Sequence, residues 1–355
     1  MSTIKYLGIG NPLLDITAPA TAETLKEFEL VEGTAILAEE KHMALYPRVQ
    51  AAADVRYCPG GSSMNTARAL QWMLSATAPH SVAFVGCVGA DESGRILRDA
   101  VVSSGVEPLF LETAARPTGR CAALITDHER TLVTSLAAAE LYDVAHLRTA
   151  PAVQAALASA QVYYSEGFFT TVSPAALVDL GRRALAEGKH FMFNVSAPFL
   201  PNFYWADMSR VLEYVDHLFC NETEAATVAR KMQWPDPDDI ERVAERICAL
   251  PRAPGATTGR TAVITHGPRE TVVCGPATGG KPRRFMPIKC TPDEIKDTNG
   301  AGDCFVAGFI SQFLQGADLD VCVAAGHYCA WKVIHEVGCS LSGTPDFDPA
   351  SVSKK

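Results

Sequence analysis

The sequence lacks several features that would point to whole classes of protein. It contains no run of about 18 uncharged apolar residues, the minimum for a membrane-spanning helix. It also contains no long run of Lys and Arg, and its 31 basic residues stand against 40 acidic ones, for a formal net charge of −9. Because nucleic-acid binders usually carry a basic stripe, we expect neither a membrane nor a nucleic acid as a partner.

Spacings typical of metal sites and disulfide frameworks are missing too. None of the 11 cysteines is spaced C-x-x-C, and none of the nine histidines is spaced H-x-x-x-H. Most cysteines lie among apolar residues, where a thiol behaves as a small hydrophobic group. Residues Met1–Gly10 include no basic segment followed by a long apolar one, as a secretory signal would. These features predict a cytoplasmic protein with reduced cysteines.

What the sequence does contain is an alternation of short apolar runs with segments of helical periodicity, in a chain of 355 residues that is 48% hydrophobic. This alternation predicts an α/β fold with a mostly parallel sheet and helices on both faces. The predicted strands are Ile4–Gly10, Ser81–Gly86, Gln161–Glu166, His190–Val195, Asp216–Cys220 and Thr261–His266. The predicted helices are Asn65–Leu74, Ser93–Ser104, Pro174–Glu187, Glu222–Lys231 and Asp238–Leu250.

Two regions interrupt the alternation. Thr17–Tyr57 is expected to contribute helical segments and polar turns, and Pro117–Leu136 a hairpin of the strands Arg120–Thr126 and Thr131–Leu136. Strands that do not alternate with helices are typical of a small sheet placed across the main one. We therefore expect a lid made of residues 17–57 and 117–136 on a core made of residues 1–16, 58–116 and 137–355.

The motif Asp297-Thr-Asn-Gly-Ala-Gly-Asp303 precedes apolar residues at helical spacing, which predict a helix from near Gly302. The small residues Gly300, Ala301 and Gly302 leave N–H groups accessible at the helix start, where the helix dipole favours an anion. The dipole would also keep Asp303 ionised, ready to accept a proton from a hydroxyl that attacks a phosphoryl group. Dipole compensation is the simpler explanation of Asp303 alone, but it does not explain the glycines.

This motif resembles the C-terminal signature of the ribokinase-like (PfkB) sugar kinases, and Gly60-Gly61-Ser-Ser-Met-Asn65 matches their N-terminal Gly-Gly-x-x-x-Asn signature. The resemblance covers roughly residues 6–347 and implies a ribokinase-like three-layer α/β core with a small mixed α/β lid. Longer stretches similar to the adenosine kinases of that family are Gly8–Asp15, Ala137–Ala139, Gly167–Phe169, Thr171–Pro174, Ser196–Phe199, Asn221–Thr227, Gly326–Tyr328 and Gly338–Cys339.

The resemblance implies two groups of nucleoside-binding residues. Asp15 follows the first strand, at the sheet edge where open α/β sheets bind ligands, and its carboxylate could accept from both hydroxyls of a ribose. Gly60, Gly61 and Asn65 would complete the ribose site, although a glycine turn before a helix explains them equally well. The positions that correspond to the adenine pocket are Asn11, Leu136, Ala138 and Phe169.

On the phosphate side, Asn221-Glu-Thr-Glu224 resembles the Asn-x-x-Glu motif that places Mg²⁺ and phosphate through ordered water, with Glu224 as the metal contact. Carboxylate and amide oxygens suit Mg²⁺, but a helix cap would use the same residues. Arg130, at the hairpin tip, corresponds to an arginine that contacts phosphate, and an exposed solvated arginine is the alternative. The remaining positions that correspond to ATP contacts are Thr265, Gly267, Asn299, Gly302 and His327.

The resemblance implies an ATP- and Mg²⁺-dependent kinase that acts on the 5′-hydroxyl of adenosine, with Asp303 as the base and the turn around Gly300 to Gly302 as the anion site. We expect a monomer. Two alternatives stay open: a kinase of the same family for another nucleoside or a sugar, and a nucleoside-binding protein without catalysis.

Overall fold

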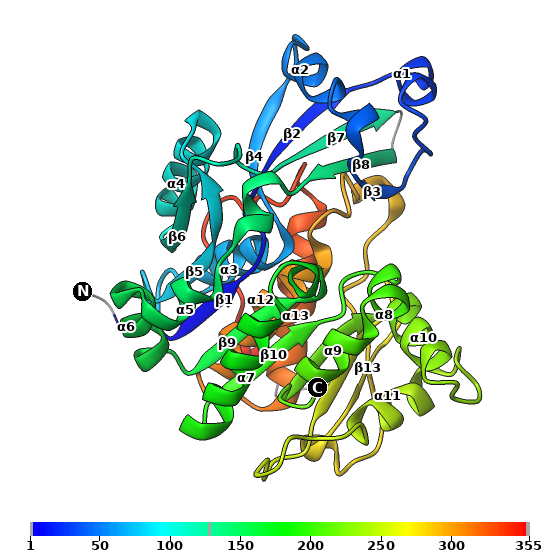
Figure 1. Cartoon of the computed structure of the whole chain (residues 1–355). Coiled ribbons are helices and arrows are strands. Elements are labelled where there is room, and N and C mark those ends of the chain that lie inside the picture. The colour runs from blue at the N-terminus through cyan, green and yellow to red at the C-terminus, as the bar shows by residue number, and fades with distance from the viewer. Residues whose placement is uncertain (1–2, 127–128, 353–355) are drawn as a thin grey trace.

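The computed structural model describes residues 3–126 and 129–352, which form two β-sheets (Figure 1). The larger sheet has nine strands in the order β14-β13-β12-β11-β10-β9-β1-β5-β6. Its strands are β1 (Tyr6–Ile9), β5 (Val82–Gly89), β6 (Glu107–Thr113), β9 (Val162–Glu166), β10 (His190–Asn194), β11 (His217–Asn221), β12 (Thr261–Thr265), β13 (Thr271–Cys274) and β14 (Arg283–Phe285). The smaller sheet has five strands in the order β3-β8-β7-β2-β4.

All neighbouring pairs of the larger sheet from β6 to β12 are parallel, whereas β13 and β14 are added antiparallel. Side chains of one strand alternate between the two faces, so Leu7 and Ile9 enter one hydrophobic core and Tyr6 enters the other. All eight residues of β5 are buried, as expected for a central strand with helices on both faces. The predicted three-layer α/β fold is confirmed.

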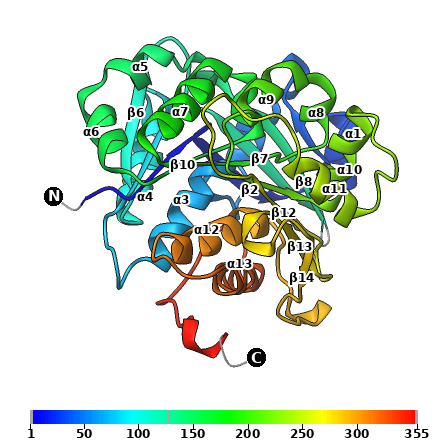
Figure 2. The ribbon, with the colours of Figure 1, turned by 90° about the horizontal axis from the view of Figure 1, so that it is seen from below.

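The helices form two layers around this sheet, which Figure 2 shows edge-on. One face is covered by α5 (Val144–Thr149), α6 (Pro151–Ser159), α7 (Pro174–Glu187), α9 (Trp205–Leu212), α10 (Glu222–Lys231) and α11 (Ile240–Cys248). The other is covered by α3 (Ser62–Met73), α4 (Glu92–Ser103), α12 (Ala301–Phe313) and α13 (Leu319–Ile334). A short helix, α8 (Phe199–Phe203), precedes α9.

All six predicted strands and all five predicted helices are present, with ends that differ by a few residues. The strands β6, β13 and β14 were not predicted. Strand β6 lies at the edge of the sheet and contains Pro108, a residue that sheets tolerate at edges but that weakens a strand pattern. The other two have only four and three residues, too few for a periodic signal.

The smaller sheet forms the lid, at the top of Figure 1. The predicted hairpin is present as β7 (Arg120–Thr126) and β8 (Glu129–Ser135), paired antiparallel. The other strands, β2 (Leu13–Pro19), β3 (Ala35–Leu37) and β4 (Arg56–Gly60), accompany α1 (Ala22–Glu27) and α2 (Leu45–Gln50). The segment expected to be helical thus supplies strands as well, and the expected boundaries after residues 16 and 57 fall inside β2 and β4.

The lid sheet has one apolar face and one face toward the core. Ile16, Ala122 and Val133 pack against α1 and α2, whereas Asp15 and Cys121, one position earlier on β2 and β7, face a cavity. Within the described ranges, no helix is both long and apolar enough to cross a membrane.

Candidate active site

The glycine-rich motif forms a tight turn that leads into α12. Gly300 precedes the helix with φ +76°, a left-handed conformation, and a Cβ atom there would lie 2.6 Å from the Sγ of Cys339. The space around Gly302 is open. The first turn of a helix leaves N–H groups without intrahelical acceptors, and Gly302 and Asp303 bring such groups to the cavity wall. The N–H of Ala301 is already bonded within the turn, at 3.2 Å.

The Asp303 carboxylate is held by two donors from α3. Ser62 Oγ donates to Oδ1 at 2.6 Å, and Asn65 Nδ2 donates to Oδ2 at 3.0 Å. Burial raises the pKa of Asp303 above its usual value, and these two hydrogen bonds oppose the rise. Burial thus opposes the helix dipole, which was expected from the sequence to keep Asp303 ionised. A base with a raised pKa accepts a proton more readily near neutral pH.

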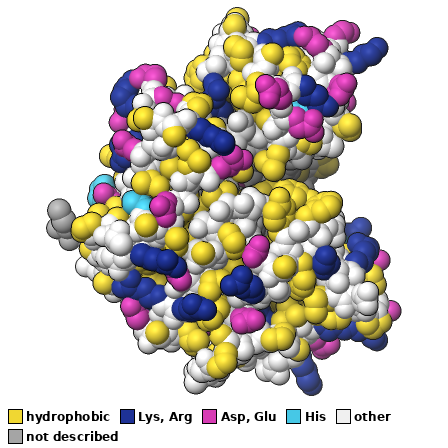
Figure 3. Space-filling view, in the orientation of Figure 1, with side chains coloured by type: hydrophobic (Ala, Val, Ile, Leu, Met, Phe, Trp, Pro, Cys, Tyr) yellow, Lys and Arg dark blue, Asp and Glu magenta, His cyan; other side chains and the backbone are white. Residues whose placement is uncertain are grey.

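Asp303 and the turn line a cavity of about 890 Å³ between the core and the lid. A notch between these two parts is visible on the right of Figure 3. The volume is within the range of small-molecule sites. The predicted site residues that line it are Asn11, Asp15, Gly61, Asn65, Leu136, Asn221, Glu224, Thr265, Asn299, Gly300, Ala301, Gly302 and Asp303.

The predicted ribose residues lie together where the lid joins the core. Asp15 lies on β2 of the lid sheet and not directly at the end of β1, because the chain crosses between sheets after β1. A Cβ atom on Gly60 would lie 2.0 Å from Oδ1 of Asp15, and one on Gly61, where φ is +98°, would lie 2.1 Å from the carbonyl oxygen of Asn11. Position 61 therefore requires glycine, whereas a side chain at position 60 would force the Asp15 carboxylate to move. Gly60 itself does not line the cavity.

Two residues expected in the adenine pocket are core residues instead. Phe169 is fully buried, with its ring 5.4 Å from that of Tyr142, and Ala138 is also fully buried. The half-buried Phe168 lines the cavity, with its ring 6.0 Å from that of Phe199. Successive residues of the 3₁₀ turn Gly167–Thr171 point about 120° apart, so only one of the two phenylalanines can face the cavity.

Asn221 and Glu224 form a reciprocal helix cap at the start of α10. Asn221 N–H donates to Glu224 Oε2 at 3.0 Å, Asn221 Nδ2 donates to Glu224 Oε1 at 2.9 Å, and Glu224 N–H donates to Asn221 Oδ1 at 2.8 Å. Burial raises the pKa of Glu224 to about 7. The cap and the metal-placing role predicted from the sequence are thus compatible, since the capped residues line the cavity.

Two residues expected near ATP lie away from the cavity. Gly267 is exposed in the turn after β12. His327 is buried, its Nε2 lies 2.9 Å from Thr271 Oγ1, and burial lowers its pKa to about 4. A packed neutral histidine describes it better than a ligand contact. The backbone of Arg130 lies in β8, but its side chain is outside the described part of the structure.

Sequence reasoning missed several residues of the cavity. Glu166 and Asn194 end β9 and β10, and polar residues at the carboxyl ends of parallel strands were an available signal. Ser62 belongs to the Gly-Gly motif but was passed over. Apolar lid residues that also line the cavity are Leu13, Ile36, Leu37 and Leu132; short strands gave no sign of them.

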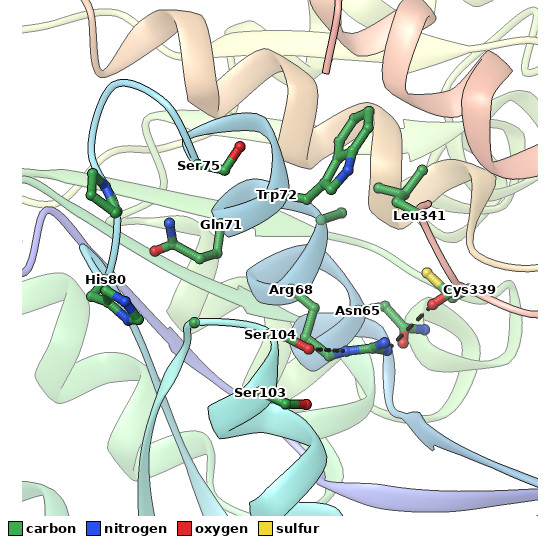
Figure 4. Close-up of a pocket in the computed structure, with 13 residues that line it drawn as sticks. Asn65, Arg68, Gln71, Trp72, Ser75, His80, Ser103, Ser104, Cys339 and Leu341 are labelled. Atoms are coloured by element: carbon green, nitrogen blue, oxygen red, sulfur yellow. Dashed lines mark hydrogen bonds between the residues drawn. The ribbon is translucent and has the colours of Figure 1, made fainter. Parts of the chain in front are cut away.

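A second cavity, of about 490 Å³, is lined by residues of α3 from Asn65 to Trp72 together with Ser104 and Cys339 (Figure 4). Arg68 crosses it, donating from Nε to Ser104 Oγ at 3.2 Å and from Nη1 to the carbonyl oxygens of Pro59 at 3.1 Å and Cys339 at 3.3 Å. Arg68 thereby joins the lid strand β4 to the loop that packs against Gly300. This cavity lies where helix α3 meets the loop around Cys339.

Comparison with known proteins supports this picture. The family model described as pfkB family carbohydrate kinase matches residues 28–346. The adenosine kinase of Dictyostelium discoideum is 41% identical over 341 residues, which cover 96% of this chain and 97% of that protein. Adenosine kinase 1 of Arabidopsis thaliana is 38% identical over 342 residues, with 96% and 97% covered.

Among solved structures, Anopheles gambiae adenosine kinase in complex with P1,P4-di(adenosine-5) tetraphosphate has a TM-score of 0.89 and 39% identity, covering 96% of this chain and 98% of that one. The Schistosoma mansoni adenosine kinase in complex with 2-fluoroadenosine has a TM-score of 0.89 and 31% identity, covering 97% and 98%.

Proposed function

The chain belongs to the pfkB family of carbohydrate kinases, and from this premise we propose that it transfers the γ-phosphoryl group of ATP to the 5′-hydroxyl of adenosine, giving AMP and ADP. Its relatives named adenosine kinase cover nearly its whole length. The observation that carries the proposal is the placement of Asp303, the glycine turn before α12 and Asp15 on the walls of one cavity.

In this mechanism Asp15 binds the ribose diol and sets the position of the 5′-hydroxyl relative to Asp303. Asp303 accepts the hydroxyl proton as the oxygen attacks the γ-phosphorus. Ser62 and Asn65 keep the carboxylate oriented through their hydrogen bonds. The N–H groups of the turn, at Gly302 above all, stabilise the negative charge on the transferring group. Closure of the lid excludes water as a competing acceptor.

Mg²⁺ would neutralise charge on the ATP phosphates when bound. Asn221 and Glu224 supply the hard oxygen atoms that this ion prefers. Both line the same cavity as the turn around Gly300 to Gly302. Within the described ranges no cluster of three or more His, Cys, Asp and Glu residues is placed to hold a metal. The ion would therefore depend on phosphate oxygens and water, which Glu224 would orient.

Adenosine is favoured over a free sugar because the lid contributes an apolar wall. Ile36, Leu37 and Leu132 face the cavity together with Phe168, and such a surface suits a purine ring. A kinase for another nucleoside is the second candidate, since apolar contacts alone do not distinguish purines. We further propose that the chain works as a monomer in the cytoplasm.

A coupled assay of ADP release tests this function. Adenosine, inosine and ribose are compared at equal concentration with ATP and Mg²⁺. We expect adenosine to give the highest kcat/KM and ribose almost none. Preference for inosine would indicate the second candidate, and binding of adenosine without ADP release would indicate a catalytically silent protein.

A further inference from the structure

A carboxyl group that the mechanism above does not use lies on the floor of the cavity. Glu166, at the end of β9, is only 1% exposed yet lines the cavity. Its Oε2 accepts the N–H of Phe168 at 3.0 Å. On the other side, a Cβ atom on Gly10 would come within 2.8 Å of Oε1. The carboxyl group is thus enclosed between the end of β1 and the turn that carries Phe168.

Among the residues that the structure describes, no positively charged group is paired with Glu166. None of the ion pairs found among the described residues involves it. The titratable groups that act on it or feel its charge are Asp303 from α12, Tyr6 from β1 and Tyr164 from β9. Burial holds the pKa of both phenols well above the ordinary value, so they stay neutral. Burial and the charge of Asp303 together raise the pKa of Glu166 to about 8.

Polar atoms without partners surround the same floor. Within the described part of the chain, both side-chain polar atoms of Asn11, which is 4% exposed, and Oδ1 of Asn65 have no hydrogen-bond partner, and both residues line the cavity. Ser63 Oγ, beside Gly10, also has none among the described residues. The backbone N–H groups of Phe168, Asn11 and Phe169 face the Glu166 carboxyl and oppose the rise in its pKa, but burial has the larger effect. A protonated carboxyl group offers both a donor and an acceptor. The neutral acid can therefore form hydrogen bonds with amide and hydroxyl groups that have no partner among the described residues.

We propose that Glu166 is a positioning residue for the phosphoryl transfer and that it works only as the neutral acid. In that form it holds the floor beneath Asn11 and Phe168 without placing a second negative charge beside Asp303 and the ATP phosphates. Its ionisation introduces that charge into a poorly solvated site, where like-charge repulsion is strong. The reaction then declines at alkaline pH. This inference rests on the proposed function of the site.

The pH dependence of Glu166→Gln tests the proposal, because glutamine imitates the neutral acid. For the wild-type chain we expect kcat/KM for adenosine to fall about tenfold per pH unit above an apparent pKa near 8. The variant should keep its activity within about threefold from pH 7 to pH 9.5. The matched control is Glu107→Gln, which removes an exposed carboxylate at the start of β6 and should keep the wild-type decline. A variant that keeps the full alkaline decline overturns the proposal.

Two further measurements do not depend on turnover. The folded chain holds the Glu166 proton between the ordinary glutamate pKa and about pH 8, whereas the unfolded chain has lost it. Wild-type stability should therefore fall relative to Glu166→Gln as pH rises through this window. If the variant does not fold, infrared titration of Glu224→Gln, with glutamate isotope-labelled, still decides. This substitution removes the other described glutamate whose pKa burial raises, to about 7, so a protonated carboxyl band should persist at pH 7 and be lost as the pH rises through about 8. An ionised Glu166 at pH 7 overturns the proposal.

Failure of this inference is distinguishable from failure of the proposed function. A wild-type chain that phosphorylates adenosine, with an alkaline decline unchanged in Glu166→Gln, contradicts only the role of Glu166. A wild-type chain that releases no ADP with adenosine at any pH contradicts the function itself, while the infrared titration still reports the state of the carboxyl group.

Discussion

At the scale of single residues, the candidate site contains buried carboxylates whose neighbours offset part of the free-energy cost of burying them. Asp303 would be costly as a buried charge, and the donors Ser62 and Asn65 on α3 offset part of that cost. The hydrogen bonds of the reciprocal cap with Asn221 likewise offset part of the cost of burying the Glu224 carboxylate. In each case a neighbouring side chain holds the carboxylate in place through hydrogen bonds.

The adjacent residues Phe168 and Phe169 are expected to have different roles, the first in binding and the second in stability. Phe168→Ala should raise KM for adenosine by at least about fivefold through lost contact with the base, with little change in the free energy of unfolding. Phe169→Ala should instead reduce that free energy by about 3–5 kcal/mol, because it opens a cavity in the core. Steady-state kinetics and urea unfolding of both variants check this, and the reverse pattern would show that Phe169 contacts the base.

The residues predictable from sequence were those that belong to a local motif. Asn65, Asp303 and the glycines form recognisable patterns, and the structure places them together. Glu166 was not predicted although its place at the carboxyl end of a strand was an available signal, because nothing local shows that a glutamate there is buried. Whether Phe168 or Phe169 faces the cavity depends on how the five-residue 3₁₀ turn is rotated relative to the cavity. No sequence pattern shows that rotation.

At the scale of elements, helix ends are closed by specific side chains. The fully buried Arg260, which immediately precedes β12, donates to the carbonyl oxygens of Val215, Ile247, Leu250, Pro251 and Leu212. These carbonyls lie at and after the ends of α9 and α11, where helices leave acceptors unpaired. Arg260 thus donates the hydrogen bonds that water would otherwise donate to the carbonyl groups at both helix ends.

Arg260→Leu should therefore lower the free energy of unfolding by at least about 3 kcal/mol, since several buried carbonyls lose their donor together. Arg210→Leu, on the exposed face of α9, is the control and should change it by less than about 1 kcal/mol. Chemical denaturation of the two variants supplies the comparison. Equal stability of both would mean that water satisfies these carbonyls in place of Arg260.

Elements were predictable where burial is continuous and unpredictable where it is not. Strands such as β5 are apolar throughout and bounded by turns, so the sequence identifies them. Strand β4 is exposed over its first two residues and contains Pro59, and β3 has only three residues. Both exist because β2 and β8 offer them an edge to pair with, a tertiary effect that no local pattern contains.

At the scale of the whole molecule, the net acidity of the chain does not conflict with the proposed binding of an anionic cosubstrate. The net charge of −9 is compatible with a phosphate site made from backbone N–H groups at a helix start. The cavity exists only because two sheets meet, with Asp15 from the lid and Asp303 from the core on its walls. Binding a nucleoside should therefore stabilise both sheets together.

Adenosine alone should raise the melting temperature of the chain, because a ligand at about 100 times its Kd adds about 2.7 kcal/mol to the stability of the folded state. Ribose at the same concentration should have little effect. Differential scanning fluorimetry with both compounds measures this. Equal shifts from the two would mean that the apolar wall of the lid takes no part in recognition.

The central claim is that Asp303 is the base for phosphoryl transfer, and Asp303→Asn tests it most directly. We expect kcat to fall by at least about 100-fold, while the Kd for adenosine, measured by calorimetry, stays within about threefold of the wild-type value. Asp293→Asn, at an exposed site before the motif, should leave both quantities unchanged. Near-normal turnover of Asp303→Asn would contradict the account.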